Sequence, residues 1–308
     1  MGGNTPKISV IIVSYNVWSY LQACIKSVMA QSGVNTEIIV IDNNSLDGSI
    51  TRIQQEFPGV KLIANKENKG FSAANNQGIN LASGEYVLLL NPDTEIKQND
   101  CLLNLCKALD SYNKGGIVAP CLLNTDGSFQ PSFWTTSFLS QLFLELFYLH
   151  LFAKKEKPTK AINVQAASGA SLLFEKALVK KTGALDENMF WMEDIDFCYR
   201  VRKTGGEILY NPDTEVIHHG GKSSTNYAVV LPNQVMSKVK FYKKNGSVIQ
   251  YAALTILSLV FIISRWFAFA VLSLTFKKVF AEKRKAYGVA VKGYFKYYFS
   301  GNKAIINI

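Results

Sequence analysis

The chain has 308 residues, of which 48% are hydrophobic and 18% are charged, so it can form a sizeable core and does not have the composition of a disordered protein. Its net charge of +10 is typical of proteins with an anionic partner, such as a nucleic acid or a membrane surface. Residues 277–308 alone hold eight basic side chains and one acidic side chain, so the rest of the chain is nearly neutral, which argues against a nucleic-acid-binding core.

The first ninety residues alternate between apolar, β-branched runs and segments with helical periodicity. The apolar runs predict strands at 8–14, 36–41, 60–64 and 85–90, and the segments between them predict helices at 21–31, 47–57 and 72–82. Further strands are predicted at 115–120 and 165–174, and an apolar helix is predicted at 138–152. Strands that alternate with helices form a mostly parallel sheet flanked by helices, so the predicted class is α/β.

Polar side chains follow three of the predicted strands at the edge where such sheets bind ligands. They are Tyr15 and Asn16, then Asp42 and Asn44, and finally Asn91 and Asp93. We therefore expect a cleft for a nucleotide at this edge. Neither GxGxxG nor GxxxxGK[ST] follows any of these strands, which argues against a dinucleotide-dependent dehydrogenase and against a P-loop enzyme.

Seven blocks of sequence occur between residue 8 and about residue 225. The blocks are SVIIVSYN at 9–16, VIDNNSLDGS at 40–49, NKGFSAANNQGI at 68–79, LLLNPDTEI at 88–96, ASGASLLF at 167–174, FWMEDIDFCYRVRKTG at 190–205 and IHHGGKSS at 217–224. Their order and approximate spacing resemble the family 2 inverting glycosyltransferases, and within them the rhamnosyltransferase-like branch. The resemblance implies the GT-A fold of nucleotide-diphospho-sugar transferases over residues 1–225.

The resemblance implies a donor site. Asp42 corresponds to the family carboxylate that accepts the N3–H of a uracil or thymine ring, although an Asx-turn role is the alternative. Asp93 stands at the DxD position and would bind Mg²⁺ or Mn²⁺ at the diphosphate, whereas Asn91 departs from that motif and brings no charge. His218 corresponds to a further metal ligand, but the adjacent His219 leaves open which ring faces the metal.

The segment from 68 to 78 is rich in asparagine and glycine. Lys69 and Gly70 precede a predicted helix whose N-terminus could face a diphosphate. Asn76 belongs to the same predicted donor site. The alternative is that the asparagines of this segment only buttress the loop.

The resemblance also implies an acceptor site. Asp194 corresponds to the general base that takes the proton of the acceptor hydroxyl, and Glu193 would contact the acceptor or orient the site. Trp191 and its apolar neighbours would exclude water, and Gly169 would let a sugar approach the backbone closely. The alternative for the acidic cluster is a favourable interaction with the dipole of a helix.

Residues 226–308 predict a helical, basic region that associates with the membrane. The stretch 251–276 is apolar except for Arg265 and is long enough to cross a bilayer. Basic residues flank it on both sides, so a single span would place one cluster on the wrong side. We expect a hairpin or in-plane helices that bend at Arg265, at the cytoplasmic face of the inner membrane, with helices packed on the catalytic domain as the alternative.

Together these features predict transfer of a hexosyl unit, with rhamnosyl as the favoured case, from a dTDP- or UDP-sugar to a saccharide or a lipid-linked saccharide in the synthesis of a cell-surface glycan. Two alternatives are a nucleotidyltransferase and a degenerate nucleotide- or glycan-binding subunit. A nucleotidyltransferase would carry a basic, glycine-rich loop after the first strand, which is absent here. A processive polysaccharide synthase is disfavoured because the chain has no QxxRW motif.

Overall fold

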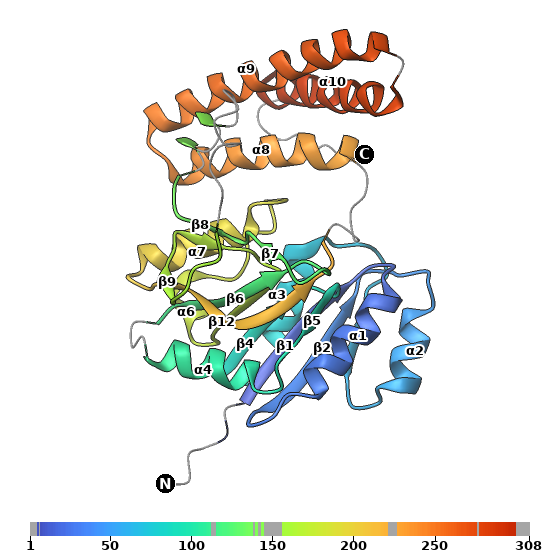
Figure 1. Cartoon of the computed structure of the whole chain (residues 1–308), viewed down its shortest axis with the longest axis vertical. Coiled ribbons are helices and arrows are strands. Elements are labelled where there is room, and N and C mark those ends of the chain that lie inside the picture. Colours follow the sequence, from blue (N-terminus) through green and yellow to red (C-terminus); the bar gives the residue numbers. More distant parts are fainter. Residues whose placement is uncertain are drawn as a thin grey trace. The chain divides into compact units, whose positions relative to one another are not determined.

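The structure, a computed structural model, describes residues 5, 7–111, 115–137, 139–140, 143–144, 156–220, 227–275 and 277–299 (Figure 1). The chain forms two compact units. The sheet unit comprises 1–135, 155–188 and 193–223, and the helical unit comprises 136–154, 189–192 and 224–308. The predicted helix at 138–152 falls mostly outside the described residues.

The first half of the sheet unit is built as predicted. Four parallel strands lie in the order β3-β2-β1-β4, namely β1 (Lys7–Ser14), β2 (Asn35–Asp42), β3 (Lys61–Ala64) and β4 (Tyr86–Leu90). The helices between them are α1 (Trp18–Met29), α2 (Ser49–Glu56) and α3 (Phe71–Leu81). Helix α1 begins three residues earlier than expected because Asp47 Oδ2 accepts a hydrogen bond of 2.9 Å from the N–H of Trp18, which satisfies a free donor of the first turn.

The second half of the sheet is mixed. Strand β11 (Ser171–Glu175) lies antiparallel between β4 and β6 (Ile117–Leu123), and β12 (Ile208–His218) lies parallel to β6. The remaining elements of this unit are β5 (Thr94–Ile96), β7 (Phe129–Gln130), β8 (Phe133–Trp134), β9 (Ile162–Asn163), β10 (Ala166–Ala167), α4 (Cys101–Ser111), α6 (Leu178–Thr182) and α7 (Glu193–Lys203). Strands β5, β7 and β9 pair antiparallel with strands of this sheet.

The single strand predicted at 165–174 is wrong. The chain forms β10, turns at residues 168–170, and continues as β11. Strand β10 pairs with β8 in a separate two-stranded sheet, whereas β11 enters the main sheet, so the chain must leave one ladder before it joins the other. The turn contains Gly169, one of the predicted site residues.

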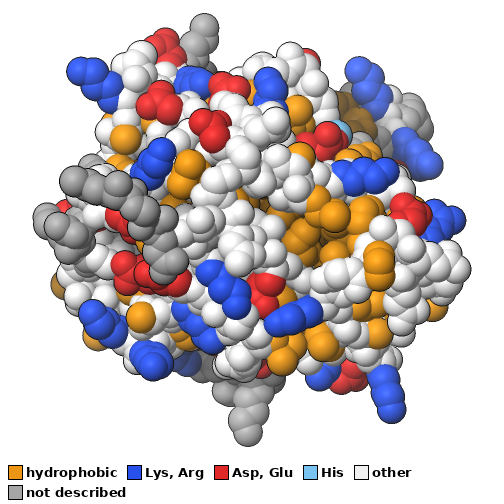
Figure 2. All heavy atoms as spheres, turned by 90° about the horizontal axis from the view of Figure 1, so that it is seen from below, with side chains coloured by type: hydrophobic (Ala, Val, Ile, Leu, Met, Phe, Trp, Pro, Cys, Tyr) orange, Lys and Arg blue, Asp and Glu red, His pale blue; other side chains and the backbone are white. Residues whose placement is uncertain are grey.

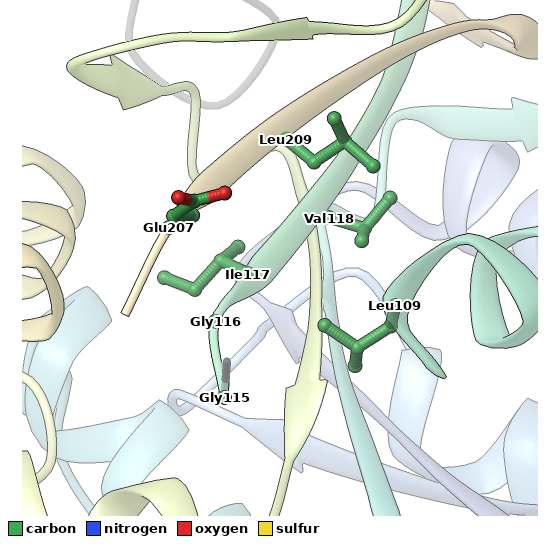
Figure 3. A pocket seen from close by; sticks show the side chains of 7 residues that line it. All are labelled: Leu109, Gly115, Gly116, Ile117, Val118, Glu207 and Leu209. Carbon is green, nitrogen blue, oxygen red and sulfur yellow. The ribbon is translucent and has the colours of Figure 1, made fainter. Parts of the chain in front are cut away.

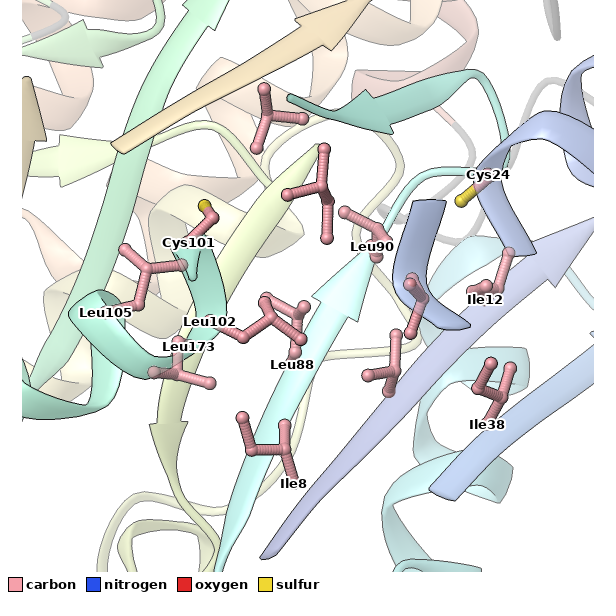
Figure 4. Packing of buried hydrophobic residues seen from close by; sticks show 14 of the residues in the cluster. Ile8, Ile12, Cys24, Ile38, Leu88, Leu90, Cys101, Leu102, Leu105 and Leu173 are labelled. Carbon is pink, nitrogen blue, oxygen red and sulfur yellow. The ribbon is translucent and has the colours of Figure 1, made fainter. Parts of the chain in front are cut away.

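The core fills both faces of the sheet. On one face Ile8 and Ile12 pack with buried side chains of α1 and α4, among them Cys24 and Leu102 (Figure 4). On the other face α3 comes so close that a Cβ at Gly78 would lie 2.4 Å from Ile11 Cγ2. Each buried aliphatic side chain contributes about 1.5–3 kcal/mol of transfer free energy. Packing on both faces therefore stabilises the sheet and holds the ends of its strands in place.

The helical unit contains α8 (Tyr227–Asn245), α9 (Val248–Leu272), a 3₁₀ turn at Ser273–Thr275 and α10 (Lys278–Phe299). Helices α9 and α10 are antiparallel neighbours, since the hydroxyl of Tyr294 donates a hydrogen bond of 2.6 Å to the carbonyl of Thr255 and Phe269 stacks on Tyr287. Ser247 and Gln250 form a capping box that begins α9.

The bend predicted at Arg265 is wrong. Arg265 lies inside the continuous helix α9, and the chain reverses only after Leu272. The residues around Arg265 include neither glycine nor proline, so nothing in the local sequence breaks the helix. The guanidinium group lies 5.0 Å from the centre of the Phe261 ring, an attractive cation–π contact one turn away.

The exposed charges are mixed on the face of the molecule shown in Figure 2. Lysine and arginine side chains are interspersed there with aspartate and glutamate side chains, and they do not gather into one basic patch. A phosphate backbone is bound by basic side chains that form a patch or stripe, and this face does not offer one.

Candidate active site

The ends of β1 and β2 form one rim. Ser14 and Asp42 are paired in register, so both strands end at the same level. Beyond them, the N–H of Asn16 donates a hydrogen bond of 2.9 Å to Ser45 Oγ, and Asn16 Oδ1 accepts one of 2.7 Å from the N–H of Leu46. Asn16 and Asn44 have φ values of +54° and +70°, a left-handed conformation that asparagine tolerates better than most residues.

Asp42 has a buried carboxylate with one unused oxygen. Its Oδ1 accepts a hydrogen bond of 2.8 Å from the N–H of Ser45, but Oδ2 is buried and has no partner. An unsatisfied buried acceptor costs about 1–3 kcal/mol, and a hydrogen-bond donor from a ligand would offset this cost. Tyr15, which is 42% exposed, and Asn44, which is also exposed, remain accessible on the same rim.

The predicted donor-site residues in and just before α3 have different surroundings. Lys69 is exposed, and Gly70 begins the helix with φ +82° while its carbonyl accepts a hydrogen bond from Asn43. Asn76 instead joins α3 to a neighbouring loop, because its amide donates to the carbonyl of Leu185 and to Glu187 and also accepts from the N–H of Leu185. Both ends of the Asn76 amide are thus used within the protein, as expected for a residue that buttresses a loop.

Asp93 and His218 lie next to each other although 125 positions separate them in the sequence. Strands β5 and β12 pair Thr94 with His218, and His218 Nε2 lies 3.5 Å from Asp93 Oδ1. Asp93 is 1% exposed, and this Oδ1 has no hydrogen-bond partner. Asn91 Oδ1 is also buried without a partner.

His218, and not His219, faces Asp93. The ring of His219 is paired instead with Glu95, with His219 Nε2 2.8 Å from Glu95 Oε1, and lies against the ring of Tyr20. Successive residues of an extended chain point to opposite sides, so the two histidines separate at the end of β12. The His219 N–H donates a hydrogen bond of 2.9 Å to the carbonyl of Asp93, which ties the two segments together.

The donor set fits a divalent cation that a substrate completes. Across the described ranges, no three His, Cys, Asp or Glu side chains converge into a metal cage. Mg²⁺ is often held by one or two protein carboxylates together with phosphate oxygens of the substrate, and two ligands roughly 2.1 Å from an ion and about 90° apart lie about 3 Å from each other. The unpaired Asp93 Oδ1 and the neighbouring His218 Nε2 approach this arrangement.

Asp194 is held by the turn between β10 and β11. Its Oδ2 accepts a hydrogen bond of 2.7 Å from the N–H of Gly169, and its Oδ1 accepts one of 2.8 Å from the N–H of Ile195. A Cβ at residue 169 would lie 3.1 Å from Asp194 Cβ, so a larger residue there would have to displace Asp194 by a few tenths of an ångström. The close approach predicted for Gly169 is thus made by Asp194, and contact of Gly169 with an acceptor stays a prediction.

The same turn connects Asp194 to the Asn91–Asp93 segment. The carbonyl of Ala170, the residue after Gly169, accepts a hydrogen bond of 2.9 Å from the N–H of Asn91. The consecutive residues Gly169 and Ala170 therefore join the candidate base Asp194 to the segment that carries the candidate metal ligand Asp93. Burial raises the pKa of the Asp194 carboxyl above its usual range, although the N–H groups of Gly169 and Ile195 act in the opposite direction.

Asp196 forms a buried ion pair within the protein. It is fully buried, and its Oδ2 accepts a hydrogen bond of 2.7 Å from Arg200 Nε one helical turn away. Arg200 in turn donates to the carbonyls of Thr182, Gly183 and Ala184.

Glu193 begins α7 and is partly exposed. Trp191 belongs to the helical unit, is 40% exposed and has φ +75°.

A small cavity elsewhere in the sheet unit does not form a ligand site. It has a volume of about 10 Å³ and lies at the start of β6 and β12, lined by Leu109, Gly115, Gly116, Ile117, Val118, Glu207 and Leu209 (Figure 3). A cavity of roughly 10–15 Å³ holds one water molecule at most. It also lies at the opposite ends of these strands from His218, which ends β12.

Sequence comparisons agree with the motifs. A model of the family described as Glycosyl transferase family 2 matches residues 9–183. The chain is 29% identical over 261 residues to the low-salt glycan biosynthesis hexosyltransferase Agl10 of Haloferax volcanii, with 81% of each chain covered. It is 26% identical over 257 residues to the N-acetylglucosaminyl-diphospho-decaprenol L-rhamnosyltransferase of Mycobacterium tuberculosis, with 71% of this chain and 78% of the relative covered.

Solved structures share the fold. The mannosyltransferase PcManGT from Pyrobaculum calidifontis, in complex with GDP-Man and Mn²⁺, superposes with a TM-score of 0.56 at 15% identity over 96% of this chain and 88% of that one. GalNAc-T7 with UDP, GalNAc and Mn²⁺ gives a TM-score of 0.57 at 18% identity over 78% of this chain and 48% of that one. These likenesses confirm the predicted GT-A fold. Because the family model matches more than half of its length, the chain belongs to glycosyl transferase family 2.

Proposed function

We propose that the protein is an inverting hexosyltransferase in glycan biosynthesis, with Asp194 as the general base. The observation that carries this proposal is the turn at Gly169 and Ala170, which hydrogen-bonds Asp194 on one side and Asn91 on the other. Such a turn sets a proton acceptor beside the segment expected to hold the diphosphate of the donor. A single displacement needs both groups at fixed separation, because the nucleophile and the leaving group react in line.

In the proposed reaction, Asp194 takes the proton of the acceptor hydroxyl while the hydroxyl oxygen attacks the anomeric carbon of the donor. The bond from that carbon to the diphosphate oxygen breaks, and the nucleoside diphosphate leaves with the electron pair. One displacement inverts the anomeric configuration. The raised pKa of the Asp194 carboxyl makes it a stronger base than an exposed aspartate.

Asp93 and His218 would hold Mg²⁺ or Mn²⁺. The unpaired oxygen of Asp93 beside His218 Nε2 supports this part of the proposal. A divalent cation held by these two residues would supply positive charge that neutralises the leaving diphosphate. Asp42 would accept a hydrogen bond from a pyrimidine N3–H, since its Oδ2 has no partner within the protein.

The donor and the acceptor are proposed from the relatives. The name of the Mycobacterium tuberculosis relative specifies an L-rhamnosyl group and a diphospho-decaprenol acceptor, and that of the Haloferax volcanii relative specifies a hexosyl group. We therefore expect a dTDP- or UDP-linked hexose, with rhamnose favoured, and a saccharide or lipid-linked saccharide as acceptor.

The stereochemistry of the product tests the mechanism. The full-length protein with Mn²⁺, a panel of dTDP- and UDP-hexoses and a lipid-linked acceptor should give a product whose new linkage has the anomeric configuration opposite to that of the donor. Proton NMR of the first-formed product measures this configuration directly. Retention of the donor configuration would contradict the single displacement, and no transfer from any donor in the panel would contradict the hexosyl assignment.

The helical unit would bind the cytoplasmic surface of the inner membrane through one face of α9. Residues 248–275 contain an 18-residue window with a mean hydropathy of 2.1 and are long and apolar enough to cross a bilayer. Six of the exposed apolar side chains of α9 recur at helical spacing on one side, namely Ile249, Ile256, Val260, Ile263, Phe267 and Val271. The buried residues Leu254, Ser258 and Ile262 lie on the opposite side. An apolar stripe on a helix whose other side is packed is typical of in-plane membrane binding.

The lysines of α10 provide a test that leaves α9 intact. Replacing exposed Lys278, Lys285 and Lys292 with glutamine should weaken binding to anionic liposomes by up to about 100-fold, because each basic residue near such a surface contributes about 1 kcal/mol. Co-sedimentation with phosphatidylglycerol-containing vesicles measures the effect. The matched control replaces exposed lysines of the sheet unit, Lys66, Lys107 and Lys180, and should bind like the wild type. Equal binding by both triple variants would contradict a contribution of the α10 lysines to membrane binding.

A further inference from the structure

We infer that Gln130 is a positioning residue that fixes the tautomer of His218 for metal binding. This inference rests on the proposed metal role of Asp93 and His218. Gln130 ends the short strand β7, which pairs antiparallel with β6 and places the Gln130 side chain beside the end of β12.

The amide of Gln130 has only one orientation consistent with its neighbours. Its Nε2 lies 3.3 Å from the backbone carbonyl oxygen of His218 and 3.0 Å from Asn124 Oδ1. A backbone carbonyl only accepts hydrogen bonds, so the atom beside it must be the NH₂ group. Gln130 Oε1 therefore faces His218 Nδ1, at 2.8 Å.

This orientation sets the hydrogen on the His218 ring. Because Gln130 Oε1 is an acceptor only, His218 Nδ1 must carry a hydrogen, and the neutral ring then has its lone pair on Nε2. That lone pair points to the side of Asp93, whose unpaired Oδ1 is 3.5 Å away. In the neutral ring, two electron-pair donors at this distance repel each other unless a cation binds both, so Gln130 prepares His218 as a metal ligand.

The hairpin that carries Gln130 is braced by its own turn. The N–H of Asn124 donates a hydrogen bond of 2.8 Å to the carbonyl of Ser128, and Asp126 accepts from both the N–H and the hydroxyl of Ser128. Gly127 takes the left-handed conformation that closes the turn, with φ +82°. Because the turn is closed by local hydrogen bonds, Gln130 approaches His218 from a fixed position.

The decisive experiment measures Mn²⁺ affinity in the full-length protein. The variant Gln130→Met keeps the length of the side chain but removes the acceptor, so Mn²⁺ should bind about 10- to 100-fold more weakly. The free-Mn²⁺ signal in electron paramagnetic resonance is followed with saturating UDP in one series and dTDP in another. Glu95→Gln is the matched control, since Glu95 holds the neighbouring His219 and not His218, and its Mn²⁺ affinity should stay at the wild-type value.

A second measurement separates positioning from a general structural effect. The chain has three histidines, so proton–nitrogen correlation spectra of ¹⁵N-histidine-labelled protein can be assigned with a His218→Gln variant. In metal-free wild type at a pH where the ring is neutral, His218 should show its hydrogen on Nδ1, and Gln130→Met should show both tautomers. An unchanged tautomer or unchanged Mn²⁺ affinity in Gln130→Met would overturn the inference. If His218→Gln also leaves Mn²⁺ affinity unchanged, the proposed metal site itself is wrong.

Discussion

Replacing Asp194 with asparagine should lower turnover by about 10²–10⁴-fold and leave the dissociation constant of the nucleoside diphosphate unchanged. Asparagine keeps the shape and can still accept the N–H of Gly169, but it cannot take a proton. The loss should appear in kcat because the base acts on the acceptor and not on the nucleotide. Initial rates and nucleotide titration calorimetry on the same preparation measure the two quantities separately.

Asp196 is the matched control for this substitution, because it is a buried carboxylate one position beyond Ile195 on the same helix. Its partner Arg200 binds three consecutive carbonyls, so Asp196→Asn should lower the free energy of unfolding by about 3–5 kcal/mol. Turnover per folded molecule should change little. If Asp196→Asn instead abolishes turnover in folded protein and Asp194→Asn remains active, Asp196 is the base and the assignment is wrong by two residues.

The rate of the wild-type enzyme should also depend on pH in a defined direction. A general base works only when ionised, and burial raises the pKa of the Asp194 carboxyl above that of an exposed aspartate. The midpoint of the fall of kcat toward acid pH should therefore lie above the pKa of an exposed aspartate, and this limb should be lost from the residual activity of Asp194→Asn.

The parts of the fold that were predicted from sequence depend on local patterns. Strands β1, β2 and β4 contain continuous apolar runs at 10–13, 38–41 and 86–90, which is the pattern of a strand covered on both faces. Strand β12 was not predicted because its Asn211-Pro212-Asp213 segment has the composition of a turn. The structure accommodates this segment as an irregularity in the pairing with β6 between Asn211 and Glu215. A tertiary partner, absent from any local pattern, thus keeps the strand continuous.

The candidate site was predicted in part for the same reason. The positions of Asp42 and Asp93 after strand ends follow from local sequence and from the family motifs. The contacts of Gly169 with Asp194 and of Gln130 with His218 join residues 25 and 88 positions apart, and no spacing rule reaches so far. The bend expected at Arg265 is wrong because it was inferred from the basic residues on both sides of the apolar stretch, whereas the local sequence, which has no helix break there, decides the backbone.

Asp93→Asn should remove metal-dependent binding of the nucleotide while leaving the protein at least as stable as the wild type in metal-free buffer. Asp93 is 1% exposed and its Oδ1 accepts no hydrogen bond, and burial of a charged oxygen without a hydrogen bond is costly. Asparagine removes that charge at almost the same volume. Since a bound cation contributes several kcal/mol of charge stabilisation in the transition state, kcat/KM should fall by at least about 100-fold.

Thermal unfolding distinguishes this functional cost from a structural defect. Mn²⁺ with UDP or dTDP should raise the Tm of the wild type, because a ligand that binds only the folded state stabilises it by about 2.7 kcal/mol at 100 times its Kd. The Asp93→Asn variant should show the same or a higher Tm without ligand and no shift with it, whereas Glu95→Gln should shift like the wild type. Full turnover of the wild type in EDTA, or a Tm shift in Asp93→Asn equal to that of the wild type, would show that Asp93 does not hold the cation. A higher Tm of Asp93→Asn in metal-free buffer would show that the Asp93 charge lowers the stability of the free protein. Such a charge is kept because the bound ligand requires it.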